Sequence, residues 1–332
     1  MATPVRIGLI GVGGMARAHI NQLSRLPDVQ ITALCDINPE QIERAKKQFP
    51  EFLNGAFETA DYKELLARED VDAVEIATPH TLHFEMGMEA IKAHKHVLME
   101  KPMVCTVEHA KTLLAALEGY DKVFALAYQR HAQGVYVYMR DKIASGELGQ
   151  VQFVNALLSQ SWKKGTAGTW RQQMALSGGG QLNDSGSHIL DVIMWITGLT
   201  VADVSAFIDF SGTEVDQNSA LSIKFTNGGQ GNISILGDTC VGWHEDITIW
   251  CEKGAFFLRN GKLEFCNEKN VRTTIDGEHL PPTRSIDEDF LSVIRGERPA
   301  PAAPPLCGLK TIELTEAAWK SADKNGEPVN MN

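Results

Sequence analysis

Positive charge is scarce in this chain of 332 residues. Its 31 lysines and arginines are outnumbered by 42 aspartates and glutamates, which gives a formal net charge of −11. Nucleic-acid binding needs a basic surface that replaces the counterions of the phosphate backbone, so this composition argues against a nucleic-acid partner. An acidic protein can still hold a local basic pocket, and an acidic substrate is not excluded.

Cysteine pairs and long apolar runs are also missing. The six cysteines are scattered and form no Cys-x-x-Cys pair, so neither a zinc knuckle nor a disulfide framework is indicated. We expect reduced thiols and a cytoplasmic location. No apolar run approaches the length of a membrane span, and the first one, residues 5–10, is followed at once by glycines. That leaves no room for a signal peptide, so we expect a soluble protein without a membrane partner.

The first third of the chain alternates short apolar segments with amphipathic ones. Strands are predicted at Val5–Ile10, Gln30–Cys35, Ala73–Ala77, His96–Met99 and Val123–Ala127, and helices at Met15–Arg25, Pro39–Gln48, Asp61–Ala67, Thr81–Ala93 and Thr106–Leu117. This alternation predicts a parallel sheet with right-handed crossovers. The strands are apolar at nearly every position, which is typical of a sheet that helices cover on both faces.

The pattern changes after residue 128. Further strands are predicted at Val151–Gln160, Val201–Phe210, Ser219–Phe225, Gln230–Leu236, Asp246–Cys251 and Ala255–Leu258, and further helices at Ala132–Ile143, Ser187–Ile196, Ile286–Ile294 and Leu309–Ala322. Strands in series without intervening helices predict a largely antiparallel open sheet. We therefore predict an N-terminal doubly wound α/β (Rossmann) domain, residues 1–128, and a C-terminal α+β domain, residues 129–332, whose last helices have the reach to pack back on the first domain.

A glycine-rich turn joins the first predicted strand to the first helix. Gly11 permits the tight turn, and Gly13 lets the backbone approach a pyrophosphate. Gly14 relaxes the turn further, and Met15 opens the helix, whose free N–H groups face the phosphates. Such a glycine string occurs by chance in many chains, but its position between strand and helix favours a dinucleotide site.

Asp36 ends the second predicted strand. A carboxylate at this position accepts hydrogen bonds from both ribose hydroxyls and repels a 2′-phosphate. Ile37 and Asn38 follow it, with no lysine or arginine beside it to hold that phosphate. The cofactor is therefore expected to be NAD rather than NADP. The alternative is that Asp36 merely caps the helix that starts at Pro39, and the two roles are compatible.

Several polar motifs follow later strands, at the edge where doubly wound folds bind ligands. We assign these residues to the cofactor site: Thr78, Pro79, His80, His83, Glu100, Lys101 and Gln129. Another motif lies in the second domain, where Gly178-Gly179-Gly180 leads to Asp184 and His188. His83 and Glu100 lack a third ligand at suitable spacing, so we expect no metal site.

These motifs resemble those of the glucose–fructose oxidoreductase / inositol dehydrogenase / rhizopine-catabolism (Gfo/Idh/MocA) family. The likeness covers essentially the whole chain, because the glycine turn, Asp36, the Thr78 and Lys101 motifs, Trp170-Arg171 and the string from Gly178 to Trp195 follow in the family's order and spacing. One departure is His80, which stands where the family usually has Asn or a small residue. The resemblance also implies a cis Lys101–Pro102 peptide bond.

By this resemblance Lys101, Asp184 and His188 match the family's catalytic residues, and their chemistry agrees. Oxidation of an alcohol needs a base for the hydroxyl proton, and the imidazole of His188 titrates near working pH. Asp184 lies four residues before it, on the same face of a helical turn, and can orient the ring. Lys101 can donate to the reacting oxygen. Whether Lys101 or His188 takes the proton stays open, and we favour His188.

Each assignment has a structural alternative: a solvated lysine, a helix cap and a core histidine. Their joint occurrence in both domains favours the catalytic interpretation. For substrate binding we add Trp162, Trp170 and Arg171 to Lys101, Asp184 and His188. Aromatic rings stack on the C–H faces of sugars, although core packing is the commoner fate of tryptophan.

Three functions remain to be weighed. The first is NAD-dependent oxidation or reduction of a hydroxyl or keto carbon in a sugar, sugar derivative or cyclic polyol. The second, known among relatives, is glycoside cleavage by transient sugar oxidation with a recycled cofactor. A non-catalytic NAD-responsive regulator ranks last, because the catalytic residues are intact. An open sheet also needs a cover, so we expect a homodimer or homotetramer formed through the C-terminal sheet, as the resemblance implies.

Overall fold

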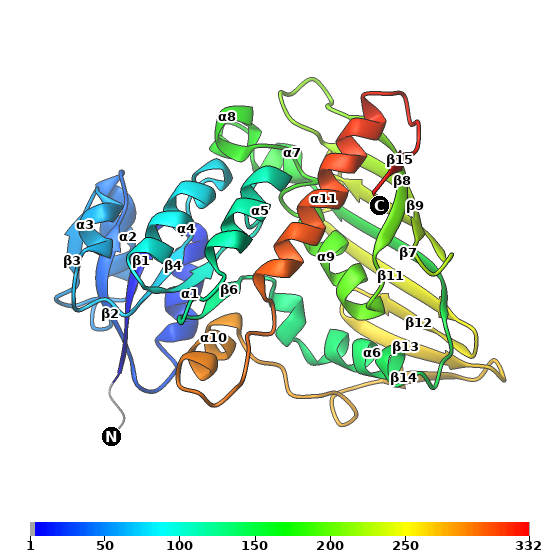
Figure 1. Ribbon diagram of the computed structural model, residues 1–332, viewed down its shortest axis with the longest axis horizontal. Coiled ribbons are helices and arrows are strands. Elements are labelled where there is room, and N and C mark those ends of the chain that lie inside the picture. The colour runs from blue at the N-terminus through cyan, green and yellow to red at the C-terminus, as the bar shows by residue number, and fades with distance from the viewer. Residues whose placement is uncertain (1–3, 332) are drawn as a thin grey trace. The chain divides into compact units, whose positions relative to one another are not determined.

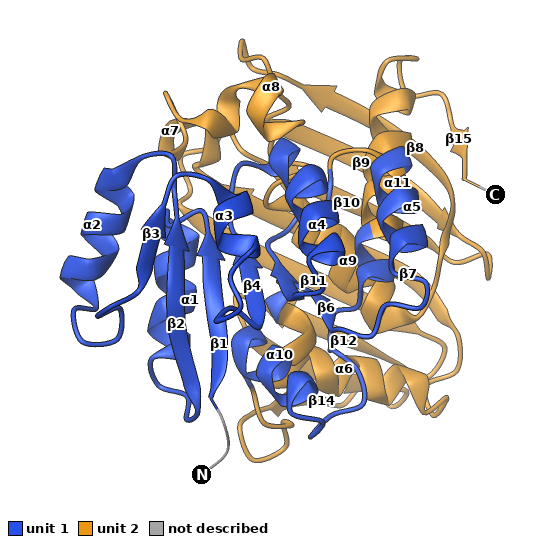
Figure 2. Cartoon of the chain, turned by 60° about the vertical axis from the view of Figure 1, so that its left-hand side comes forward, with its two compact units in different colours: residues 1–104, 108–129, 284–308 blue, residues 105–107, 130–283, 309–332 orange. Residues whose placement is uncertain are grey.

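The computed structural model describes residues 4–331, and the chain divides into two compact units (Figure 2). Unit 1 comprises the residues up to 104, residues 108–129 and residues 284–308. Unit 2 comprises residues 105–107, residues 130–283 and the residues from 309 onward. The chain thus passes from unit 1 to unit 2 after residue 129, and a late segment returns to unit 1.

Unit 1 is built on a parallel sheet, as predicted, with six strands where five were expected (Figure 1). Its strands, in spatial order, are β3 (Phe57–Thr59), β2 (Val29–Cys35), β1 (Val5–Ile10), β4 (Ala73–Ile76), β5 (His96–Met99) and β6 (Phe124–Leu126). The central strand β1 buries Ile7, Leu9 and Ile10 almost completely. Full burial of each such side chain contributes about 1.5–3 kcal/mol, which explains the apolar runs that predicted these strands.

Helices connect the strands of unit 1. They are α1 (Gly14–Leu23), α2 (Pro39–Gln48), α3 (Tyr62–Leu66), α4 (His83–Lys92) and α5 (Val107–Ala116, from its second residue on), with the short 3-10 helix η1 (His80–Leu82). Unit 1 also contains α10 (Ile286–Ile294), which lies in the segment that returns from unit 2. Local signals fix some of their bounds. The α2 helix begins at Pro39, where the Asn38 side chain accepts a hydrogen bond from the Glu40 amide at 3.1 Å.

Unit 2 contains a nine-stranded sheet that is mostly antiparallel. In spatial order its strands are β14 (Arg272–Ile275), β13 (Lys262–Asn267), β12 (Gly254–Arg259), β11 (Trp243–Cys251), β7 (Val151–Gln160), β10 (Gln230–Leu236), β9 (Asn218–Phe225), β8 (Val201–Asp209) and β15 (Val329–Asn330). The β7 and β10 strands pair in parallel, whereas the turns at Asn227-Gly228 and Asn260-Gly261 join antiparallel neighbours. This is the α+β fold expected for the second domain.

Helices cover one face of this sheet. They are α6 (Gly134–Ala144), α9 (Gly186–Thr197) and α11 (Pro305–Ala322, from residue 309 on). Unit 2 also contains the short helices α7 (Trp162–Gly165) and α8 (Met174–Ser177) and the 3-10 helices η2 (Gln129–Ala132, from residue 130 on) and η3 (Trp170–Gln172). Apolar side chains of α6, α9 and α11 form one core with the inner face of the sheet, including Met139, Ile193 and Leu314.

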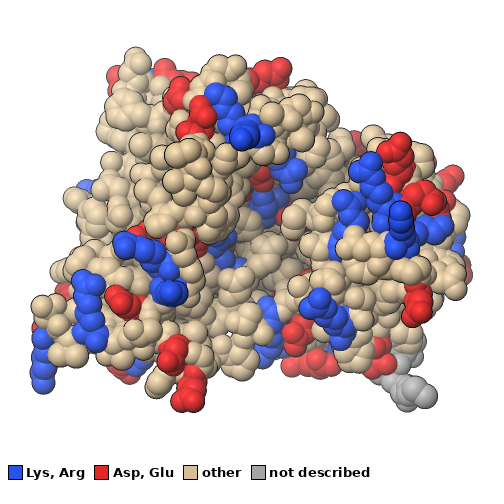
Figure 3. All heavy atoms as spheres, turned by 180° about the vertical axis from the view of Figure 1, so that it is seen from behind, with Lys and Arg blue, Asp and Glu red and all other residues tan. Residues whose placement is uncertain are grey.

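Within residues 4–331 no helix combines the length and the apolar character that crossing a membrane requires. On the face drawn in Figure 3, lysine and arginine side chains lie intermixed with aspartate and glutamate side chains.

Candidate active site

The carboxyl ends of five parallel strands lead directly into the residues predicted to bind the cofactor. Gly11 follows β1, Asp36 follows β2, Thr78 lies just beyond β4, Glu100 follows β5 and Gln129 lies beyond β6. Because parallel strands end at a common edge of the sheet, one edge of unit 1 carries all five positions. Doubly wound folds bind nucleotides at this edge.

The glycine turn is shaped for a ligand that approaches the backbone. Gly11 has a φ of +83°, and a Cβ atom there would lie 2.7 Å from the carbonyl oxygen of Ala77, so only glycine fits. Gly13 and Gly14 face open space, with no heavy atom within 4 Å of an added Cβ. No side chain caps the first turn of α1, and Met15 is 39% exposed. The free N–H groups at this helix end fit a pyrophosphate.

Asp36 is anchored to the same turn. One carboxylate oxygen accepts the Val12 N–H at 2.8 Å, and the other accepts the Asn38 N–H at 2.8 Å. Each oxygen keeps a second lone pair for a ribose hydroxyl. The structure adds Arg17, which the sequence analysis missed: its guanidinium donates to the Val12 carbonyl at 3.1 Å and to Gln41 at 3.0 Å. Asp36 and Arg17 thus both contact the backbone of Val12, although no cation adjoins Asp36 in sequence.

His83 joins two of the turns at this edge. It is fully buried, and its ring nitrogens lie 2.7 Å from the carbonyl oxygen of Pro102 and 3.0 Å from that of Thr78. Burial lowers the pKa of His83, which favours the neutral ring. The ring of His80, itself buried, meets that of His83 edge-on at 5.8 Å. In this structure His83 therefore ties the Thr78 turn to the Lys101 turn.

Lys101 begins a turn that its neighbour holds. Its backbone N–H donates to the Glu100 carboxylate at 3.0 Å, and the Lys101–Pro102 peptide bond is cis, as predicted. Glu100 is buried and also contacts His19 on α1 at 3.1 Å. Burial opposes ionisation of Glu100, but the hydrogen bond from His19 and the attraction to His19 and Lys101 hold its pKa below the usual value.

In unit 2, Asp184 forms a cluster with two of the predicted substrate-binding residues. One carboxylate oxygen accepts the indole N–H of Trp162 at 2.9 Å and the Nε–H of Arg171 at 3.1 Å. Asp184 is 4% exposed and Trp162 is 5% exposed. Trp170 lies outside this cluster and packs beneath the Arg171 guanidinium, 4.5 Å from the ring centre.

The turn before Asp184 depends on a second buried carboxylate, that of Asp216. This side chain accepts the N–H groups of Gly180 and Leu182 at 2.8 and 2.7 Å and the indole N–H of Trp319 at 3.2 Å. A Cβ atom at Gly180 would lie 1.9 Å from the Asp216 carbonyl oxygen, so a side chain there would displace the turn. Burial raises the pKa of Asp216, against the effect of these hydrogen bonds.

His188 lies in the first turn of α9, which begins at Gly186. The sequence analysis placed Asp184 and His188 on one helical turn. In the structure Asp184 lies two residues before the helix begins. Asp184 is nevertheless tied to its first turn, since its carbonyl oxygen accepts the Ser187 hydroxyl at 2.7 Å. Lys101 belongs to unit 1, whereas Asp184 and His188 belong to unit 2.

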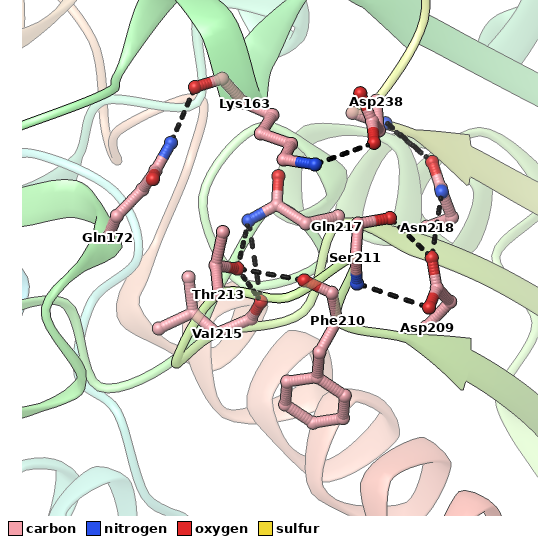
Figure 4. A network of polar contacts seen from close by, with 11 residues as sticks. Lys163, Gln172, Asp209, Phe210, Ser211, Thr213, Val215, Gln217, Asn218 and Asp238 are labelled. Carbon is pink, nitrogen blue, oxygen red and sulfur yellow. Dashed lines mark hydrogen bonds and ion pairs between the residues drawn. The ribbon is translucent and has the colours of Figure 1, made fainter.

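The segment that carries Trp162 and Arg171 is fixed to neighbouring loops of unit 2 (Figure 4). The Lys163 ammonium pairs with Asp238 at 2.9 Å, and its carbonyl accepts the side-chain amide of Gln172 at 2.6 Å. The Asp238 amide donates to the Asn218 side chain at 3.3 Å, which continues the network to β9. These contacts fix both ends of the stretch from α7 to η3.

Arg130, adjacent to the predicted cofactor residue Gln129, is 9% exposed and pairs with the buried Glu245. The Tyr136 hydroxyl donates to the same carboxylate at 2.5 Å and accepts from Arg130 Nε at 3.2 Å. Arg130 thus serves a buried network in unit 2.

The fold of unit 1, its glycine turn and the carboxylate at the end of β2 define a nicotinamide-nucleotide oxidoreductase with a Rossmann domain. Two domain models identify the group. Residues 5–128 match the oxidoreductase family with an NAD-binding Rossmann fold, and residues 136–257 match the GFO/IDH/MocA C-terminal domain. The chain belongs to the GFO/IDH/MocA family of NAD-binding oxidoreductases, and its cofactor is NAD.

Relatives with named activities are distant. Levoglucosan dehydrogenase of Pseudarthrobacter phenanthrenivorans is 28% identical over 58% of this chain and 51% of its own length. Glucose-6-phosphate 3-dehydrogenase of Bacillus subtilis is 29% identical over 58% of this chain and 53% of its own length. Both alignments thus span about half of the relative. A solved structure of levoglucosan dehydrogenase with NADH and levoglucosan shares the fold, with a TM-score of 0.89 and 21% identity over 99% of this chain and 100% of that one.

Proposed function

We propose that this protein transfers a hydride between NAD and a hydroxyl-bearing carbon of a sugar, sugar derivative or cyclic polyol. The observation that carries the proposal is the buried Asp184 carboxylate, held by Trp162 and Arg171 four residues before His188. A carboxylate so positioned suits a neighbouring imidazole that gains a proton during turnover. The similarity to levoglucosan dehydrogenase and to glucose-6-phosphate 3-dehydrogenase supports this substrate class.

Each residue of this chain has a separate task in the proposed reaction. Bound NAD supplies the hydride acceptor. His188 takes the hydroxyl proton, and Asp184 stabilises the imidazolium that results. Lys101, directed by its turn, donates a hydrogen bond to the reacting oxygen and stabilises its alkoxide character. The free N–H groups of α1 and the Asp36 carboxylate hold the dinucleotide.

The test is the absorbance of reduced nicotinamide over time, with purified protein, NAD and a panel of sugars, anhydrosugars, sugar acids, inositols and glycosides. We expect a signal from one compound class. Lys101→Ala and His188→Ala should each lower kcat by about 100-fold or more, the usual contribution of general acid–base catalysis. Both variants should still bind NADH, measured by calorimetry.

Silence across the panel from a protein that binds NADH would contradict net dehydrogenation. The same mixtures should then be analysed by chromatography for cleaved glycosides, because transient oxidation with a recycled cofactor forms product without net NADH. Absence of both signals would contradict the proposed function.

A further inference from the structure

Four titratable side chains meet in the interior of unit 1, and the proposed reaction uses none of them directly. They come from four separate elements: His19 from α1, Glu75 from β4, Glu100 from the end of β5 and Asp287 from α10. Their exposed fractions are between 2% and 5%. Buried charges are costly unless they are paired and hydrogen-bonded. The arrangement of this cluster therefore has to be explained.

The imidazole of His19 bridges two carboxylates. Its Nδ1 lies 2.7 Å from Asp287 Oδ1, and its Nε2 lies 3.1 Å from Glu100 Oε1. The other oxygen of Glu100 accepts the backbone N–H of Lys101 at 3.0 Å. A continuous chain of hydrogen bonds thus runs from α10 through α1 to the backbone nitrogen of Lys101.

A charged ring accounts for the bridge between two carboxylates. A neutral imidazole donates through one nitrogen only, whereas both nitrogens of His19 face carboxylates. Burial opposes the charge, but attraction to Asp287 and Glu75 and the two hydrogen bonds raise the pKa of His19 well above its ordinary value. His19 is accordingly an imidazolium that donates to both sides.

Glu75 limits the negative charge of the cluster. Its Oε2 lies 3.9 Å from His19 Nδ1. Burial, together with the neighbouring Asp287, raises the pKa of Glu75 to about 8. This shift favours the neutral form of Glu75, which lessens the negative charge around the imidazolium.

We propose that His19 is a positioning residue for Lys101 and acts through the Glu100 carboxylate. Asp287 holds the other nitrogen of the His19 ring. This proposal rests on the proposed function in one respect, because that function gives Lys101 its role. When the Glu100 carboxylate is held in place, it fixes the backbone N–H of Lys101, where the turn follows β5. The Lys101 side chain then leaves the backbone in one fixed direction. His19 lies on the helix that follows the glycine turn, and the same helix thus contributes to both the phosphate site and the Lys101 turn.

The experiment compares His19→Gln with His94→Gln, a matched change at a histidine whose side chain is 75% exposed. The first readout needs no substrate: amide hydrogen exchange of peptides that span residues 97–105, followed by mass spectrometry. We expect His19→Gln to accelerate exchange in this segment by about 10-fold or more, while His94→Gln leaves it unchanged. Asp287→Asn weakens the contact on the other side of the His19 ring and should accelerate exchange in the same segment by a smaller factor. This variant keeps the proposal testable if His19→Gln fails to fold.

The second readout separates positioning from cofactor binding. With an identified substrate, His19→Gln should lower kcat by about 10-fold or more, with NADH affinity changed less than about 3-fold. If His19→Gln lowers the melting temperature but exchange at residues 97–105 and kcat equal those of the parent, the proposal is overturned. His19 would then be a purely structural residue. Stoichiometric metal in the purified protein that is lost in His19→Gln would also overturn it. If no substrate is found, the exchange readout still decides, so the two proposals fail separately.

Discussion

Trp162 donates its indole N–H to the Asp184 carboxylate across 2.9 Å, and both side chains are buried. Sequence reasoning assigned this tryptophan to substrate stacking. At 5% exposure its ring has little free face within unit 2, and its polar atom is already engaged. The contact indicates a different role, in which Trp162 orients Asp184.

Trp162→Phe tests this role, because phenylalanine keeps an aromatic ring and removes the donor. Loss of a hydrogen bond to a buried carboxylate costs about 1.5–3 kcal/mol. We expect kcat to fall by about 10- to 100-fold with little change in KM. The control is Trp243→Phe, at a tryptophan that is 51% exposed, which should retain parental kinetics. A raised KM with unchanged kcat would support stacking instead.

Asp36 and Arg17 together should determine cofactor choice. Asp36→Ser removes the carboxylate that repels a 2′-phosphate, and Arg17 then offers that phosphate a cation. We expect kcat/KM for NAD to fall about 10- to 100-fold while kcat/KM for NADP rises. Adding Arg17→Gln to Asp36→Ser should abolish the gain with NADP. If the double variant keeps the gain, Arg17 does not reach the phosphate.

Glu75 should make stability decline with rising pH. Burial raises its pKa from an ordinary value of 4.5 to about 8 in the folded protein, so the folded state holds more proton than the unfolded chain between these two values. By linkage, the free energy of unfolding then falls as pH rises through this window. The groups that face Glu75 are His19 on α1, Glu100 after β5 and Asp287 on α10.

Glu75→Gln removes this dependence, because glutamine has no proton to lose. We expect its melting temperature relative to the parent to rise by roughly 4 °C or more between pH 5 and pH 9, measured by calorimetry. Glu118→Gln, at an exposed position, is the control and should show a constant difference. A constant difference for Glu75→Gln as well would mean that Glu75 is ionised throughout.

We also propose that two or more copies of this chain associate through the outer face of the unit 2 sheet. Trp250 on β11 is 46% exposed and packs edge-on against Phe257, and Phe207 on β8 is 67% exposed. Trp250→Glu should weaken association by about 10-fold or more, as expected when a charge enters an apolar contact. Light scattering decides: a parent mass of 36.4 kDa would mean a monomer and contradict the proposal.

Local patterns of apolar and polar residues predicted the bounds of several elements. The strands β1, β5, β7 and β10 and the helices α2 and α10 begin and end at the predicted residues. Four strands were missed for physical reasons. β3 has three residues and lies at an edge of the unit 1 sheet, and β15 has two residues and lies at an edge of the unit 2 sheet. β14 and its neighbour β13 lie at the other edge of the unit 2 sheet and contain charged residues such as Lys262 and Arg272.

The candidate site was predictable where its residues follow strand ends or lie close together in sequence. Thr78, Lys101 and Asp184 each belong to a short motif with its own signal. By contrast, Asp287 meets His19 across 268 positions of the chain. No local pattern encodes such contacts, because tertiary packing alone creates them.

The return of residues 284–308 to unit 1 affects how the protein is made. During synthesis the first 129 residues leave the ribosome before Asp287 is added to the chain. The contact between His19 and the Asp287 carboxylate therefore forms late. A fragment that ends at residue 128 would contain every predicted strand of the nucleotide domain and still lack that partner. Breaking a buried ion pair costs about 3–5 kcal/mol, so such a fragment should be a poor substitute for the domain within the full chain.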